Sequence, residues 1–199
     1  MNGRICVNAM AHFSRSPYHF YSFYCNPDTR NSDNGTSFNY FLYSMNDLDM
    51  EKKHDYVQWV FPNPEPSKAQ DEIAQYECKP EEYALLMGNP VVMRRIEDAI
   101  SKMLMFWGIS YNRVSNVIGV LPADRNRFIK KLVKADHNQL RFTRMLIFLR
   151  HIHRDDLAHM LFGLFRAMWL EMDVNNYTWN FWCEALGLHD QKRVPHIGR

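Results

Sequence analysis

The stretch HNQLRFTRMLIFLRHI, residues 137–152, is the part of this sequence that decides most about the fold. At about 100° per residue, it places apolar side chains on two flanks of one helix. One flank holds Met145, Leu146, Leu149 and Ile152, and the other holds Leu140 and Ile147. A helix that is apolar on both flanks is largely surrounded by protein. The stretch therefore predicts a packed domain of several helices.

Two polar stripes separate these flanks. One contains His137, Arg141, Arg144 and His151 within roughly an 80° sector, and the other contains Gln139, Thr143 and Arg150. We expect the second stripe to face solvent and the first to face inward or into a cleft. An unpaired buried guanidinium is costly, so the first stripe needs acceptors. Three interpretations stay open: ion pairs with Glu51, Asp55, Glu97 or Asp98, a cleft for a phosphate or carboxylate, or a plainly exposed face.

Helical signals extend to both sides of this stretch. Residues 90–107 have apolar side chains at spacings of three and four, and Gly108 is a natural C-terminal cap. Further helices are expected over residues 80–88, 125–135, 157–172 and 177–186, and over 50–61 with Asp47 or Asp49 as its cap. The aromatic run YHFYSFY, residues 18–24, is expected to be a short strand or an extended packing segment, and residues 109–120 are expected to be irregular.

The sequence shows no internal repeat and no Gly/Ser linker. We therefore predict a mostly α, single compact multi-helix domain with an extended aromatic N-terminal arm. The expected division is an arm over residues 1–17, the helical domain over 18–188 and a flexible tail over 189–199.

Composition excludes several classes of protein. With 46% hydrophobic and 14% aromatic residues, the chain can bury a large core without disulfides or metal. A net charge of +2 is too balanced for a binder that depends mainly on phosphate contacts. The four cysteines lack zinc-ligand spacing and are expected to be free thiols. The sequence has no apolar signal-peptide core and no run long enough to span a bilayer, so we expect a cytoplasmic protein, or a nuclear one in a eukaryote, without membrane contact.

Several motifs resemble those of one known family. MEKKHDYVQWVFP, residues 50–62, is similar to the pattern L-E-x-x-H-x-Y-I-Q-W-L-F-P of the opioid growth factor receptor conserved domain. FYCN at 23–26, Asn34-Gly35, KMLMFWGI at 102–109 and DHNQLRFTRML at 136–146 resemble further family motifs in the same order. The resemblance covers about residues 20–170. It implies a helical domain, here isolated from the long repetitive tail of the vertebrate relatives, which bind an opioid peptide and act at the nucleus.

The polar residues of these motifs form a candidate anion pocket: His54, Gln58, His137, Asn138, Arg141 and Arg144. His54 and Gln58 are one turn apart on one helix face. If that helix packs against the one at 137–152, these groups converge, and bidentate arginines beside imidazoles could bind a small anion or nucleotide.

Two weaker sites are visible. A basic run, Arg125, Arg127, Lys130, Lys131 and Lys134, could contact nucleic acid, although a solvated helix face is the commoner explanation of such a run. His151, His153 and His159 are weak metal candidates without a visible fourth ligand, and we expect no metal or other cofactor. No catalytic motif is present, so enzyme activity stays uncertain and is not favoured.

Three functional hypotheses follow. The first is an interaction module that binds a peptide or protein partner through the aromatic arm and the helical surface. The second is a protein that binds a small anion or nucleotide in the His/Arg pocket, either as an enzyme or without catalysis. The third is nucleic-acid binding through residues 125–134.

Overall fold

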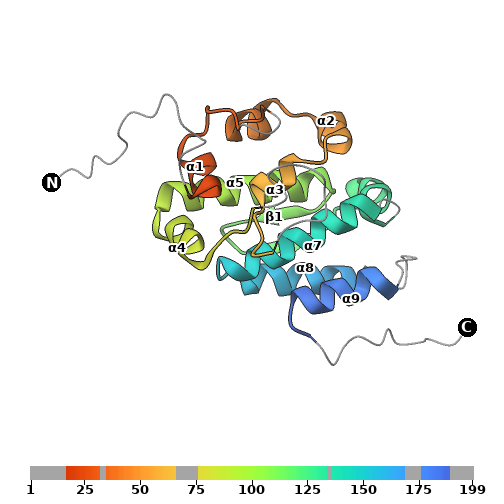
Figure 1. Ribbon diagram of the computed structural model, residues 1–199. Coiled ribbons are helices and arrows are strands. Elements are labelled where there is room, and N and C mark those ends of the chain that lie inside the picture. The colour runs from red at the N-terminus through yellow and green to blue at the C-terminus, as the bar shows by residue number, and fades with distance from the viewer. Residues whose placement is uncertain (1–16, 32–34, 66–75, 134–135, 169–175, 189–199) are drawn as a thin grey trace, which may run out of the picture.

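The computed structural model describes residues 17–31, 35–65, 76–133, 136–168 and 176–188. Figure 1 shows short helical segments above a long central helix and three further helices packed below it. In chain order the elements are α1 (His19–Cys25), η2 (Tyr40–Ser44), α2 (Asp47–Lys52), α3 (Tyr56–Val60), α4 (Pro80–Gly88), α5 (Pro90–Phe106), β1 (Ser110–Asn112), β2 (Val117–Gly119), η4 (Pro122–Asp124), α6 (Arg125–Phe128), η5 (Ile129–Val133), α7 (Asp136–His151), α8 (Asp155–Met168) and α9 (Asn176–Ala185). The predicted mostly α, compact domain is confirmed. The proposed arm and tail lie outside the described residues, apart from Pro17.

Aromatic rings from the second half of the chain form the centre of the core. Phe142 of α7 packs against Trp107, Phe165 and Trp182, with ring centroids 5.7, 4.3 and 5.3 Å away. These four residues come from the end of α5 and from α7, α8 and α9, and all of them are buried. The rings therefore hold the three C-terminal helices against the long α5.

The aromatic run at residues 18–24 forms helix α1, so the expectation of a strand or extended segment was wrong. Phe20, Phe23 and Tyr24 are buried, and their spacing of three and four places them on one helix face. The buried carboxylate of Glu82 in α4 accepts a 2.8 Å hydrogen bond from the Tyr21 backbone N–H, which supports the start of this helix. These rings belong to the core.

Residues 109–120 contain a short hairpin that sequence patterning does not predict. β1 and β2 pair antiparallel, with Tyr111 opposite Ile118 and Ser110 opposite Gly119. Three residues per strand are too few for the alternation of a longer strand to be visible.

Among the described helices, none has both the length and the apolar composition needed to cross a bilayer.

The solvent-facing side of α7 differs from the sequence expectation. Gln139 is buried, and its Oε1 accepts a 2.9 Å hydrogen bond from Thr178 of α9. Arg150, at the other end of α7, donates to the Ala185 carbonyl oxygen at 2.9 Å. This polar stripe therefore faces α9, whereas Leu140, expected inside, is 62% exposed. The prediction failed because the polar stripe can bond to a neighbouring helix.

The expected helix over residues 50–61 is broken into two. Asn46, rather than Asp47 or Asp49, caps α2, and its side chain accepts from the backbone N–H groups of Leu48 and Asp49. Residues 53–55 are not helical, and α3 begins at Tyr56. Such a break leaves backbone carbonyl groups without helical partners. The side chains that supply those partners form the site described next.

Candidate functional site

Arg141 of α7 satisfies the carbonyl groups at the end of α2. Its Nη1 donates to the Met50 carbonyl oxygen at 2.8 Å, and its Nη2 donates to the Lys53 carbonyl oxygen at 2.7 Å. Nη1 also donates to Asn138 Oδ1 at 2.9 Å, and Nη2 lies 3.2 Å from His54 Nδ1. All four hydrogens on the two Nη atoms thus have acceptors within the chain. The buried charge is stabilised by carbonyl dipoles instead of a carboxylate.

Gln58 of α3 completes the break from the other side. With its amide nitrogen turned toward the backbone, it donates to the carbonyl oxygens of His54 and Asp55 at 3.1 and 2.9 Å. Gln58 is buried, so these bonds replace water at both carbonyl groups. Its amide nitrogen is directed at the backbone of the break.

Glu51 connects α2 to the start of α7 and to η5. Its Oε1 lies 2.8 Å from His137 Nε2 and accepts from Asn138 at 3.1 Å, while its Oε2 accepts from Lys131 at 2.8 Å. Partial burial opposes ionisation, but the hydrogen bonds from Lys131 and His137 outweigh it and lower the pKa of Glu51. Lys131 Nζ also lies 3.9 Å from the centre of the Phe106 ring. Of the four carboxylates expected to pair with the first polar stripe, Glu51 pairs with His137 of that stripe.

His54 occupies the exposed edge of this cluster. Because its Nδ1 faces the Arg141 guanidinium, the neutral ring accepts a hydrogen bond there. The ring stands edge-on to that of His137, with centroids 5.5 Å apart. Partial burial, then the charges of Arg141 and His137, lower the pKa of His54. The neutral form is therefore favoured in the folded protein.

Arg144, the sixth predicted residue, lies apart from the other five. It is half-buried and donates to the Phe61 carbonyl oxygen at the end of α3, at 3.1 Å. Beside it, Tyr83 of α4 donates to the Pro62 carbonyl oxygen at 2.8 Å and stacks on His151, with ring centroids 4.9 Å apart. Burial lowers the pKa of Arg144 to about 10. This arginine is thus partly desolvated beside one carbonyl group.

The basic run is divided between different contacts. Lys131 belongs to the Glu51 cluster, and Arg127 donates to the Met105 carbonyl oxygen at 3.3 Å. Arg125 and Lys130 are exposed, and Lys134 lies outside the described residues. The predicted continuous helix over 125–135 is replaced by the short α6 and the π-helix η5.

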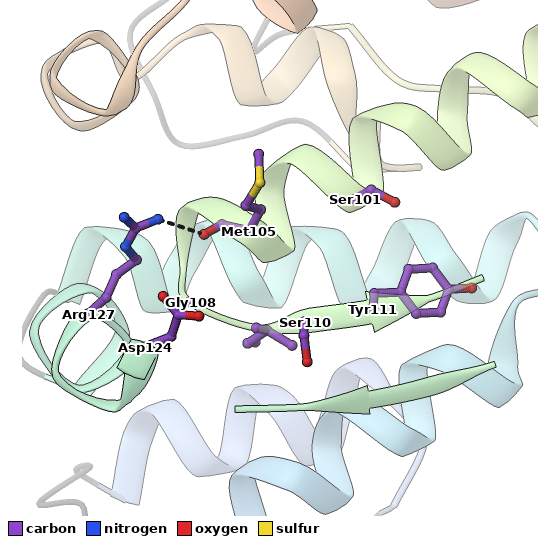
Figure 2. A pocket seen from close by; sticks show the side chains of 8 residues that line it. Ser101, Met105, Gly108, Ser110, Tyr111, Asp124 and Arg127 are labelled. Carbon is purple, nitrogen blue, oxygen red and sulfur yellow. Dashed lines mark hydrogen bonds between the residues drawn. The ribbon is translucent and has the colours of Figure 1, made fainter. Parts of the chain in front are cut away.

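A pocket of about 290 Å³ lies between the end of α5, β1 and the start of α6 (Figure 2). Its lining residues are Ser101, Met105, Gly108, Ile109, Ser110, Tyr111, Asp124 and Arg127. Figure 2 shows Asp124 and Arg127 at the same end of the pocket, with Arg127 bonded to the α5 backbone. None of the six residues of the predicted anion pocket lines it. The sequence offers no signal for this pocket because its walls form only where two stretches of the chain, residues 101–111 and 124–127, pack together.

The three metal candidates do not converge. His151 stacks on Tyr83, and His153 has a left-handed backbone conformation with φ of 57° between α7 and α8. His159 Nδ1 lies 2.7 Å from the Asp155 carbonyl oxygen in its own helix. Over the described ranges, no three His, Cys, Asp or Glu side chains are arranged to hold a metal ion.

The fold and this cluster together define a helical domain in which polar side chains of α7 brace a broken helix formed by α2 and α3. The model of one family, described as the opioid growth factor receptor conserved region, matches residues 14–178 of the chain. The chain belongs to this family. No curated protein and no solved structure matches it. The matched region ends at the first residues of α9, whereas Trp179 and Trp182 of that helix are buried in the core.

Proposed function

We propose that this domain is an interaction module that binds a protein or peptide partner through the outer face of α7 and α9. The observation that supports it most is a set of ordered but exposed apolar side chains on these helices. Leu140 is 62% exposed, Tyr177 is 78% exposed and Phe181 is 48% exposed. Large apolar side chains held in water by a rigid surface are typical of protein-binding sites.

Helix geometry places these side chains on one face. The bonds Thr178–Gln139 and Arg150–Ala185 join α7 and α9 at both ends, so the two helices run side by side in the same direction (Figure 1). Leu140 follows Gln139, and Tyr177 precedes Thr178, on the sides of their helices that turn away from the core. Phe181 is one turn beyond Tyr177.

The other two hypotheses have weaker support. Binding of a small anion by His54 and Arg141 would compete with hydrogen bonds that already satisfy the Nη atoms of Arg141. Nucleic-acid binding by the basic run would have to proceed without Lys131, which is paired with Glu51.

The test is affinity capture from a lysate of the source organism, quantified by mass spectrometry. We expect a set of proteins to be retained by the wild-type chain and lost with the Leu140→Ser/Phe181→Ser variant. The matched control is Val114→Ser, at a fully exposed position in the hairpin turn. Equal retention by all three chains, or no specific retention, would overturn the proposal.

A further inference from the structure

Among the described residues, Arg144 has fewer hydrogen-bond partners than its burial requires. A guanidinium has five N–H donors, and the bond to the Phe61 carbonyl oxygen uses one of them. Among the described residues, no carboxylate forms an ion pair with Arg144. Burial lowers its pKa to about 10, which reflects the cost of holding this charge away from water. An anion from outside the chain would offset that cost.

Several carboxylates of the described residues are engaged with other cations. Arg154 and Arg113 are paired with Glu97 and Asp98, respectively. Asp155 bonds to Arg150. Together with Glu51, whose contacts lie at the start of α7, these carboxylates do not compensate Arg144.

The surroundings of Arg144 on α7 are apolar. Leu140 lies one turn before it and Ile147 one turn after it, and with His151 they share roughly a 60° sector of the helix. Leu140 is exposed and Ile147 is half-buried. Arg144, bonded to the end of α3, thus lies one turn from the exposed apolar side chain of Leu140.

We propose that the partner of this domain is a peptide segment that places a carboxylate on Arg144 and an adjacent apolar side chain on Leu140. This inference rests on the proposed function and specifies its partner. A carboxylate can accept two parallel hydrogen bonds from one guanidinium, and the half-buried position of Arg144 strengthens such a pair. A nucleic acid fits less well, because its affinity depends on several phosphate contacts, and the exposed cations Arg125 and Lys130 belong to α6 and η5.

The experiment uses an array of ten-residue peptides in which an Asp or Glu lies within three residues of Leu, Ile, Phe or Trp. Each peptide has a twin with Asn or Gln in place of the acid. The wild-type chain is expected to bind acidic members about tenfold more tightly than their twins, because a hydrogen-bonded ion pair is lost in the twin. In Arg144→Gln this preference should disappear, whereas the matched control Arg94→Gln, at an exposed position of α5, should retain it.

A second variant tests the same proposal with Arg144 left in place. Leu140→Glu changes an exposed side chain and supplies a carboxylate one turn from Arg144, so it should weaken binding of the acidic peptides without lowering the melting temperature. If the wild type bound both twins equally, the proposed carboxylate on Arg144 would be overturned, whereas the proposed function as an interaction module would stand. An array without any bound peptide would overturn both proposals. Preferential binding of a 20-nucleotide RNA, lost in Arg144→Gln, would assign the surface to nucleic acid and overturn the peptide.

Discussion

The Nη1 atom of Arg141 lies 2.8 Å from the carbonyl oxygen of Met50, 91 residues earlier in the chain. This bond closes the end of α2 with a side chain of α7, so the break between α2 and α3 depends on a distant helix. The charge of Arg141 is compensated by backbone dipoles and by Asn138. The Arg141 guanidinium therefore holds the segment around residues 50–55 in place.

Replacement of Arg141 should be strongly destabilising. Arg141→Met removes the donors to the Met50 and Lys53 carbonyl groups and leaves both without their side-chain partner. We expect the free energy of unfolding to fall by about 3 kcal/mol, measured by urea denaturation. Arg94→Met, at an exposed position of α5, is the matched control and should change it by less than about 0.5 kcal/mol. Similar losses in the two variants would contradict the bracing role.

Stability should depend on pH through His54. Its pKa is lowered in the folded state, so the unfolded chain takes up the proton first as the pH falls. Stability contributed by neutral His54 is therefore complete above about pH 6.5 and decreases from there down to the folded-state pKa. Melting temperatures between pH 7.5 and 5.5 should fall less steeply in His54→Gln than in the wild type. His159→Gln is the control on α8 and should follow the wild type.

Glu51 affects stability at a lower pH than His54 does. Its folded-state pKa is lowered, so its contribution is present above the unfolded pKa of about 4.5 and is lost as the pH falls through the folded value. A double-mutant cycle with Glu51→Gln and Lys131→Met should give a coupling of about 1 kcal/mol at pH 7. The exposed Asp98–Arg113 pair should give less than about 0.5 kcal/mol. Equal couplings would show that the Glu51 cluster adds no stability beyond a surface pair.

Gly108 should not tolerate a side chain. Its φ is 79°, and a Cβ atom there would lie 3.0 Å from the Asp124 carbonyl oxygen and 3.1 Å from the Phe128 backbone nitrogen. Gly108→Ala should lower the free energy of unfolding by about 2 kcal/mol, through strain and through separation of α5 from α6. Gly88→Ala is the control, because a Cβ there meets no atom within 4 Å, and its urea midpoint should stay near that of the wild type.

Local patterns in the sequence were enough for the long helices and for the family. Prolines, glycines and the three-and-four spacing predict α4, α5 and α7 close to their observed ends. The family resemblance singles out His54, Gln58, His137, Asn138, Arg141 and Arg144, which converge only if the two segments pack together. The ends of the helices depend on contacts within a few turns of helix, whereas this convergence does not.

What the sequence alone determined is therefore the class of the domain and its family. Tertiary structure decided which acceptors the cluster uses, because the break at residues 53–55 frees carbonyl groups that no side-chain pattern reveals. It also decided that Gln139 and Arg150 bond to α9 while Leu140 faces solvent. The physical reason is that helical periodicity gives the direction of a side chain around its own axis, whereas the partner in that direction depends on how distant helices pack.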